Sequence, residues 1–329
     1  MARISRNFRL VGIQTNNKIM FKNDIKKEFG GIILNTGCSQ KCLFCRGPKP
    51  RIRGMELRKQ EIEIYRNILY FKKIGINKIE ISGSDPIEYN KIIELIRYLK
   101  EEGFEFVQLS THGTRLANPS FLNKLISSGL DKLRIPIYGS NTKIHDSVTQ
   151  TLGSFQHLVK GFKLLRKKNN SIDIQMSCLI VDQNKNDLVN IADFVTNELS
   201  VEDFYFSIPC INEGDLSFYI PLKNLNPYVK KLYEYVLRTN DRIKFFEIPF
   251  CVFGKLDTKH INNTILPPNL GKYNQPPPPV RTSIPDIPSY RIKKKVTMCK
   301  KCKAFNYCDG FFVNDIERFG IGNLKPVIK

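Results

Sequence analysis

Short apolar runs alternate along the chain with longer segments in which apolar residues recur at helical spacing. The apolar runs, which favour buried strands, lie at residues 31–35, 78–82, 104–110, 132–138, 172–180 and 203–208. Helical spacing follows the first run at Ile62, Tyr65, Ile68 and Leu69, and the second at Ile92, Ile96 and Leu99. Such alternation favours parallel strands joined by right-handed crossovers. The sequence therefore predicts an α/β fold, a partial (β/α)6 TIM-like barrel with its chemistry at the carboxyl ends of the strands.

The pattern divides the chain into three parts. They are an N-terminal segment at 1–29, the barrel at 30–240 and a small cysteine-rich extension at 241–329. The N-terminal segment is basic and predicts a short strand pair, at 9–14 and 18–21. The extension opens with a predicted strand, 244–251, and continues in a connector with consecutive prolines at 276–279. Because such a run cannot enter a helix or a central strand, we expect an extended spacer there.

Three cysteines follow the first predicted strand. Cys38, Cys42 and Cys45 have three and then two residues between them, directly after the apolar run 31–34. Three thiolates in so short a loop can hold three irons of an iron–sulfur cube and leave the fourth iron open. An open metal position can bind and activate a ligand. Zinc is the alternative, although its usual arrangement is CxxC with a second ligand pair downstream.

This spacing, with the aromatic Phe44 before the last cysteine, resembles the radical S-adenosylmethionine (radical SAM) superfamily. In that family the loop holds a [4Fe-4S] cluster whose open iron chelates SAM. The resemblance implies that Cys38, Cys42 and Cys45 bind this cluster and that Phe44 contributes to cofactor binding. It also implies reductive cleavage of SAM to methionine and a 5′-deoxyadenosyl radical, which abstracts a hydrogen atom from a substrate in the barrel mouth.

Two turns at the ends of the second and third strands fit the same resemblance. The residues that it assigns to SAM binding there are Ser82, Gly83, Ser84, Asp85, Ser110 and Thr111. The first turn stands where the family has its Gly-Gly-Glu motif, although the side chains differ. The second, which continues into His112 and Gly113, is similar to the family's Thr-Asn-Gly turn. Without the cysteine loop, the first would be an ordinary strand-to-helix turn.

Later strands add further candidates. Tyr138 ends the fourth strand, where the family contacts the SAM ribose. Gln175 and Ser177 share one face of the fifth strand and are candidates for the SAM carboxylate, or else core hydrogen-bonding residues. Cys210 ends the sixth strand and is the candidate catalytic residue, a thiol that delivers a hydrogen atom; a small buried hydrophobic residue is the alternative. His145 is expected to be a structural hydrogen-bonding residue.

A second group of cysteines lies near the C-terminus. Cys299, Cys302 and Cys308, with Cys251 upstream, supply four thiolates, a complete set for a closed iron–sulfur cluster or for zinc. The spacing looks like the second half of the SPASM pattern. Because the remaining SPASM cysteines are absent from the sequence, the resemblance implies one auxiliary [4Fe-4S] cluster, as in the twitch subgroup. Lysines surround this loop; their charge would raise the potential of a cluster and attract anions, or it is simply a solvated surface.

Composition limits the location and the partners. The chain has 329 residues, nine cysteines and a formal net charge of +21. We expect no secretory signal and no membrane span, since no run of ~18 apolar residues occurs. A cytoplasmic location with reduced cysteines follows as an expectation. The basic charge attracts nucleic acid or anionic substrates, or reflects a lysine-rich composition alone; no RNA-binding motif accompanies it.

The sequence thus predicts an oxidoreductase or bond-forming enzyme of the radical SAM superfamily, of the SPASM/twitch type. The expected partners are a peptide or small-molecule substrate and an electron donor such as flavodoxin or ferredoxin. The N-terminal segment is too short for the leader-binding domain that peptide-modifying members often carry. RNA modification is the alternative that the net charge suggests. The alternative hypothesis, in which the protein is not an enzyme, is an iron–sulfur electron carrier or an RNA-binding scaffold.

Overall fold

The computed structural model describes residues 29–45, 52–168, 171–211, 216–239, 242–263 and 292–328. Nearly all of the predicted N-terminal segment, with its strand pair, and the proline-rich connector lie outside the described residues. Among the helices in the described part, none is long and apolar enough to cross a membrane.

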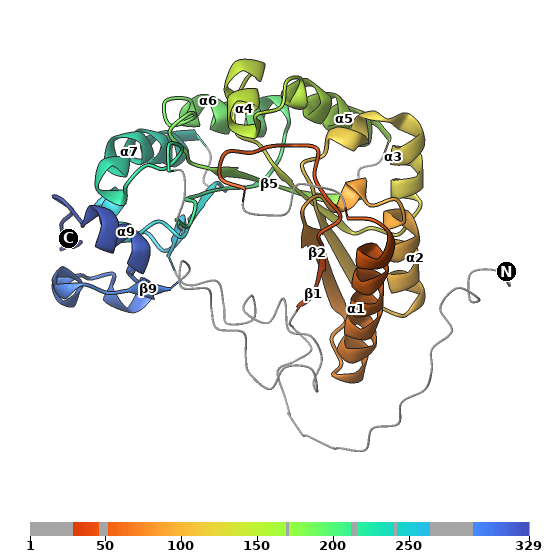
Figure 1. The fold of residues 1–329 in the computed structure, drawn as a ribbon. Helices are drawn as coiled ribbons and strands as arrows, with labels where there is room; N and C mark the ends of the chain where they lie inside the picture. The colour runs from red at the N-terminus through yellow and green to blue at the C-terminus, as the bar shows by residue number, and fades with distance from the viewer. Residues whose placement is uncertain are drawn as a thin grey trace, which may run out of the picture.

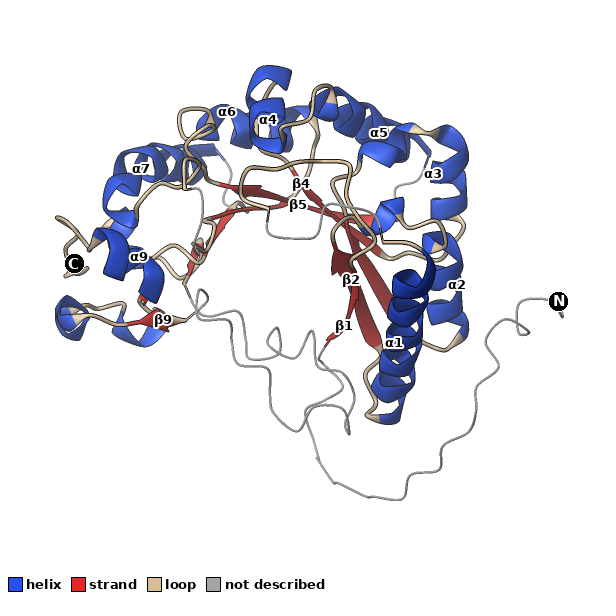
Figure 2. Ribbon diagram, viewed as in Figure 1, coloured by secondary structure: helices blue, strands red, loops and turns tan. Residues whose placement is uncertain are grey.

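A curved sheet of eight parallel strands, in chain order from one edge to the other, forms the centre of the molecule (Figures 1 and 2). Its strands are β1 (Phe29–Leu34), β2 (Lys78–Gly83), β3 (Phe106–Ser110), β4 (Lys132–Pro136), β5 (Asp173–Leu179), β6 (Asp203–Ser207), β7 (Lys244–Phe246) and β8 (Ile261–Asn262). The first six confirm the predicted strands to within two residues. The sheet is an open, partial barrel, as the alternation of strands and helices predicts.

Helices cover the outer face of this sheet (Figure 2). They are α1 (Gly54–Lys73), α2 (Ile92–Glu101), α3 (Pro119–Ile126), α4 (Thr142–Thr149), α5 (Ser154–Lys168), α6 (Leu188–Asp193) and α7 (Leu222–Thr239), followed by the short α8 (Phe250–Phe253) and α9 (Val313–Phe319). In α2 the fully buried Ile92, Ile96 and Leu99 lie along one face, as their spacing predicts. The hydrophobic core therefore lies between the helices and the outer face of the sheet.

Side-chain alternation separates this core from a polar inner face. On β2, Ile79 and Ile81 are fully buried, and Ile79 lies beside Phe71 of α1. Glu80, between them, points to the other face and contacts Arg134 of β4. Because neighbouring residues of a strand point to opposite faces, a charged residue in an apolar strand marks the inner surface. The inner face thus offers polar groups to a ligand.

The C-terminal part is attached to the last strands of the sheet. β7 pairs with β6 and β8 with β7, both in parallel, so the sheet continues past the predicted boundary at residue 240. The first of the two extra strands, β7, lies within the predicted strand at 244–251, but the end of that segment forms α8 instead. The second, β8, has two residues and is too short to leave an apolar run in the sequence. A small antiparallel sheet of β9 (Lys293–Lys294) and β10 (Phe311–Phe312) follows. Figure 1 shows α9 and β9 at the opposite end of the arc from α1 and β1.

Candidate active site and candidate metal centres

The cysteine loop leaves β1 and docks on α4. Cys38, Cys42 and Cys45 are free, partly buried thiols. The backbone N–H groups of Lys41 and Leu43 donate to the last two carbonyls of α4, each at 3.0 Å. These bonds hold the loop at two points, one on each side of Cys42, and so fix where its thiol lies.

Aromatic rings pack against Phe44 of the same loop. The Phe44 ring lies edge-on to Tyr138, with centroids 5.2 Å apart, and to Phe218 at 6.3 Å. The backbone N–H of Tyr138 donates to Nδ1 of the buried His145, at 3.2 Å. Burial lowers the pKa of His145 to about 4, so its neutral ring accepts this bond. His145 thus has the structural role that the sequence predicts.

A charged cluster also contacts the cysteine loop. Nε2 of His112 is 2.5 Å from Oδ2 of Asp85 and 3.0 Å from Oε1 of Glu88. The backbone N–H of Ser39 donates to the same Glu88 oxygen at 2.9 Å. Burial favours the neutral ring, but Asp85, Cys38 and Glu88 together raise the pKa of His112 well above its usual value. The imidazolium therefore lies against the first cysteine.

His112 belongs to the turn that resembles the family's Thr-Asn-Gly turn, but the sequence predicts no role for its side chain or for Glu88. The ligand atoms of Cys38, Glu88 and His112 all lie within 4.8 Å of one another, so both residues belong to the surroundings of the loop. The signal in the sequence was their position: His112 follows Thr111 at the end of β3, and Glu88 follows Asp85 in the turn after β2. Carboxyl ends of neighbouring parallel strands meet at one edge, which brings these turns together.

The turn after β2 is pressed against the end of β1. Gly83 has φ 129°, and a Cβ there would lie 2.2 Å from the carbonyl oxygen of Leu34. The N–H of Ser84 donates to that same oxygen at 2.9 Å. The buried Asp85 caps the short helix that follows by accepting from Ile87, at 3.4 Å. Only glycine fits this close approach, which places the predicted SAM-binding turn beside the cysteine loop.

A network of side chains crosses the inner face of the barrel. Arg134 donates from Nη1 to Oε1 of the buried Glu80, at 2.7 Å, and from Nη2 to the hydroxyl of Tyr205, at 2.8 Å. Ser110, a predicted site residue, donates to Glu80 at 3.1 Å. Thr111 is buried, and its hydroxyl accepts from the N–H of Gly113 at 3.1 Å. The residues of this network lie on strands that are distant in the sequence, so no local sequence pattern predicts it.

The remaining predicted residues lie in different places. Gln175 is in the amino half of β5, where its amide donates to both carboxylate oxygens of Asp203, at 2.9 and 2.8 Å. Ser177 lies two residues closer to the carboxyl end of β5. The partly buried Cys210 follows β6 and interacts electrostatically with Lys293. Cys210 therefore lies towards the C-terminal part of the chain.

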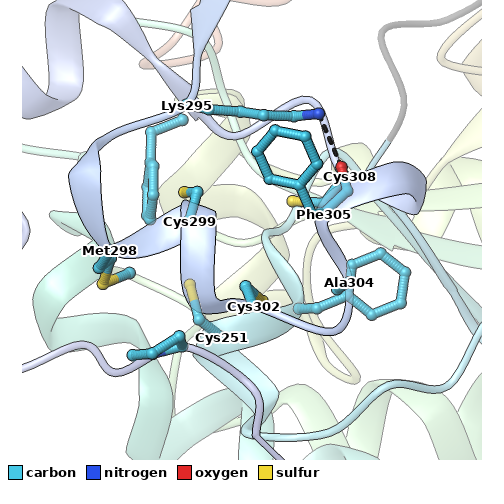
Figure 3. A pocket seen from close by; sticks show the side chains of 11 residues that line it. Cys251, Lys295, Met298, Cys299, Cys302, Ala304, Phe305 and Cys308 are labelled. Carbon is cyan, nitrogen blue, oxygen red and sulfur yellow. Dashed lines mark hydrogen bonds between the residues drawn. The ribbon is translucent and has the colours of Figure 1, made fainter.

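The four C-terminal cysteines line one pocket, as Figure 3 shows. Its other lining residues, all but one of them apolar, are Phe250, Lys295, Met298, Ala304, Phe305, Phe311 and Pro326. Burial, followed by the charges of the other three cysteines, raises the pKa of Cys251. Thiolates in an apolar pocket need a bound cation to balance their charge. The structure thus brings Cys251 to the other three, and this donor set fits a tetrahedral metal or cluster site.

Two N–H groups point at sulfur atoms of this pocket. Nδ2 of Asn263 donates to Sγ of Cys308 at 3.0 Å, and the backbone N–H of Val327 donates to Sγ of Cys302 at 3.4 Å. Hydrogen bonds of this kind orient metal-binding thiolates and adjust their basicity.

The N-terminal loop also fits a metal cluster. Burial, followed by the charges of Cys45 and Cys38, raises the pKa of Cys42 to about 12. Nearby, Oγ1 of Thr36 and Nε2 of Gln40 are buried without a hydrogen-bond partner in the part of the chain that the structure describes. A buried thiol whose ionisation is opposed by burial and by two neighbouring cysteines, next to unsatisfied polar atoms, is typical of a site that holds a charged group.

A parallel α/β barrel with a three-cysteine loop after its first strand defines the class of protein, and comparison with known families agrees. Residues 32–195 match the model of the Radical SAM superfamily. The chain belongs to this superfamily of enzymes, which implies a [4Fe-4S] cluster and SAM as cofactors. The resemblance carried by the cysteine spacing is thereby confirmed.

Curated relatives share part of the chain. An AdoMet-dependent heme synthase of Methanosarcina barkeri is 31% identical over 135 residues, which are 41% of this chain and 38% of the relative. A probable GTP 3',8-cyclase of Saccharolobus solfataricus is 22% identical over 204 residues, 61% of this chain and 64% of the relative. The chain thus spans less than two thirds of the length of these relatives.

Solved structures share the fold over more of the chain. The crystal structure of Streptococcus suis SuiB bound to precursor peptide SuiA superposes with a TM-score of 0.59 at 15% identity, covering 99% of this chain and 85% of that one. Native anSMEcpe with bound AdoMet gives a TM-score of 0.54 at 15% identity, covering 86% of this chain and 88% of that one. At these identities the likeness establishes the fold.

Proposed function

We propose that this chain cleaves SAM reductively and abstracts a hydrogen atom from a peptide or small metabolite, with a second iron–sulfur cluster in the C-terminal pocket. One observation carries the proposal: a three-cysteine loop and a four-cysteine pocket lie on the same barrel. A set of three ligands leaves a metal position for a small molecule, and a set of four closes it. The two sites therefore suit different tasks.

At the N-terminal site, Cys38, Cys42 and Cys45 hold the first cluster. When bound, this cluster and SAM supply the 5′-deoxyadenosyl radical. Phe44 and Tyr138 keep the loop in place through their ring contact of 5.2 Å. The imidazolium of His112 places a positive charge against Cys38, which lowers the cost of gathering thiolates there.

The turns around the loop bind SAM. Gly83 and Ser84 lie against the end of β1, and their turn is the proposed site for the amino group of SAM, as in the family's glycine motif. Ser82, Asp85, Ser110, Thr111 and Ser177 complete the predicted SAM-binding set at the strand ends. The amide of Gln175 already donates to the carboxylate of Asp203, so it is less available to bind SAM than a side chain without such a partner. Arg134, fixed by Glu80, is the inner-face cation for an anionic group of SAM or substrate.

At the C-terminal site, Cys251, Cys299, Cys302 and Cys308 hold the auxiliary cluster, which accepts an electron from the substrate radical or anchors the substrate. Cys210 follows β6 and interacts electrostatically with Lys293 of the C-terminal part. It remains the candidate hydrogen-atom donor. Zinc in place of the auxiliary cluster is distinguished by metal and sulfide analysis.

The relatives and the net charge support the choice of substrate classes. The SuiB structure holds a precursor peptide, and the curated relatives act on small molecules by their names. These support a peptide or a metabolite. RNA is the second candidate, because the chain has a net charge of +21.

The experiment that tests the function uses reconstituted, anaerobically reduced protein with SAM and fractions of its own cell extract. We expect 5′-deoxyadenosine above the background of Cys42→Ala, stimulated by the peptide or small-molecule fraction. Stimulation by the RNA fraction that disappears after nuclease treatment would establish RNA modification in place of the favoured substrates. Absence of 5′-deoxyadenosine from protein with a full complement of iron would contradict the proposed reaction.

A further inference from the structure

Asn263, directly after β8, connects the barrel sheet to the auxiliary pocket. Its side chain is fully buried. Nδ2 donates to Sγ of Cys308 at 3.0 Å and to the carbonyl of Gly310 at 2.8 Å, while Oδ1 accepts from Nζ of Lys293 at 2.7 Å. The backbone carbonyl of Asn263 also accepts from the N–H of Asp309, at 3.0 Å. One residue thus holds the turn that carries the fourth cysteine by both its backbone and its side chain.

Lys293 determines which way the Asn263 amide points. An ammonium group has only donors, so it must face the amide oxygen. The NH₂ end of the amide then has to face Cys308. If the amide were reversed, its NH₂ group would meet the ammonium and its oxygen would meet the thiolate, leaving both contacts repulsive. The orientation of the N–H···S bond is therefore imposed by charge.

Lys293 is itself an unusual residue for this position. Only 9% of it is exposed, and its Nζ lies 4.7 Å from the centroid of the Phe312 ring. Burial lowers its pKa, and the groups that oppose this shift are Glu247, Cys210, Asp309 and Cys308. A buried cation is costly unless negative groups surround it. The thiolate of a metal-bound Cys308 is one of the negative charges that this lysine faces.

We propose that Asn263 is a positioning residue of the auxiliary centre: its amide, oriented by Lys293, donates to the Cys308 thiolate and raises the reduction potential of the centre. The inference rests on the proposed iron–sulfur occupancy of the C-terminal pocket. A hydrogen bond to a ligating sulfur stabilises the reduced, more negative state of a cluster, and the nearby ammonium acts in the same direction. Removal of the donor therefore lowers the potential.

The chain offers a matched control. Lys294 is adjacent to Lys293, but its side chain is exposed and pairs with the exposed Glu317 at 3.2 Å. Lys294→Met removes the same charge as Lys293→Met without touching Asn263. Asn263→Leu keeps the approximate shape of the side chain and removes the donor. Together, these variants separate the hydrogen bond from general changes in charge.

The test uses the full chain with Cys38, Cys42 and Cys45 replaced by alanine, so that only the C-terminal pocket contributes iron. The reduction midpoint is followed by electron paramagnetic resonance, with iron and sulfide content measured on each sample. For Asn263→Leu we expect a shift to lower potential, about tenfold in the reduction equilibrium, or about 59 mV for one electron. Lys293→Met should shift it less in the same direction, and Lys294→Met should leave it unchanged.

Two failures are distinguishable. A parent protein without redox-active iron in the C-terminal pocket would overturn the auxiliary cluster and this inference with it. A full iron and sulfide content with an unmoved potential in Asn263→Leu would overturn this inference alone. If Asn263→Leu does not load iron, Lys293→Met decides, since Asn263 and its backbone contacts remain: an unmoved potential there contradicts the proposal.

Discussion

The two cysteine sites differ in how many thiols they gather and in what surrounds them. Cys38, Cys42 and Cys45 lie on one loop, next to the imidazolium of His112 and buried polar atoms that lack partners among the described residues. The C-terminal four line a pocket whose other walls are mostly apolar. An incomplete set of ligands in polar surroundings suits a cofactor that exchanges, whereas a complete set in apolar surroundings suits a permanent one.

The difference extends to how each site is assembled. The N-terminal thiols come from eight consecutive residues that dock on α4 by backbone hydrogen bonds. The C-terminal site needs Cys251, from α8 after β7, in addition to the loop that carries Cys299, Cys302 and Cys308. The first site therefore depends on one loop, and the second depends on the attachment of the C-terminal part to the barrel.

The largest expected effect is on SAM cleavage, which should depend on the N-terminal cysteines and not on the C-terminal ones. Cys42→Ala removes a proposed ligand of the first cluster, and we expect SAM cleavage to fall by at least ~100-fold, beyond the loss typical of residues around a metal site. Cys302→Ala removes a ligand of the second site and should leave SAM cleavage within a few-fold of the unsubstituted protein, while product formation stops. The measurement is 5′-deoxyadenosine and product from the same reduced samples. Equal loss of SAM cleavage in both variants would break the comparison.

Metal content distinguishes the sites next. Replacement of Cys38, Cys42 and Cys45 by alanine should remove about half of the iron and sulfide, because each of the two proposed [4Fe-4S] clusters holds four irons. Replacement of Cys299, Cys302 and Cys308 should remove the other half. Iron, sulfide and zinc are measured after anaerobic reconstitution. If the second set of replacements leaves iron unchanged and removes zinc, the closed site is a zinc site.

Glycines at each site give a smaller, site-specific effect. A Cβ on Gly83 would lie 2.2 Å from the carbonyl oxygen of Leu34, and one on Gly310 would lie 2.2 Å from that of Lys294. Both residues have positive φ. For each Gly→Ala variant we expect a loss of about 4 kcal/mol in the free energy of unfolding, from backbone strain and overpacking.

The control for this pair is Gly254→Ala. Gly254 has φ 71°, but a Cβ there would meet no atom within 4 Å, so about 1 kcal/mol is expected. Chemical unfolding measures the three variants, followed by SAM cleavage and iron content. Gly83→Ala should lower SAM cleavage, and Gly310→Ala should lower auxiliary iron. Equal destabilisation by all three alanines would show that close approach to the backbone adds nothing.

The sequence predicted the strands better than the faces of the helices. The apolar runs located the first six strands because buried parallel strands are continuously apolar. On α1, however, Ile62 and Leu69 are 44% and 41% exposed, while Ile64 and Phe71 are buried. Both sets fit helical spacing. Which set is buried depends on the contact of α1 with the β1–β2 edge of the sheet. A local sequence pattern does not contain this contact.

The site was predictable where it is local. The three-cysteine loop and the turn at Gly83 follow from adjacent residues. The gathering of Cys251 with the later cysteines was inferred from the number of thiols and became a geometric fact only in the fold. Pairs such as Arg134 with Glu80 connect residues on different strands, so each charge is visible in the sequence while its partner is not.

The smallest expected effect concerns pH and the support of the N-terminal loop alone, since no histidine among the described residues lines the C-terminal pocket. The pKa of His145 is lowered to about 4 from 6.5 by burial, so folding favours the neutral ring. Its contribution is complete above pH 6.5 and is lost as the pH falls towards 4, because the unfolded chain then binds the extra proton. The slope approaches about 1.4 kcal/mol per pH unit. His145→Gln keeps an acceptor for the N–H of Tyr138 and should remove this slope from the pH dependence of unfolding. An unchanged slope in the variant would show that His145 titrates normally and that the loop does not depend on its neutral ring.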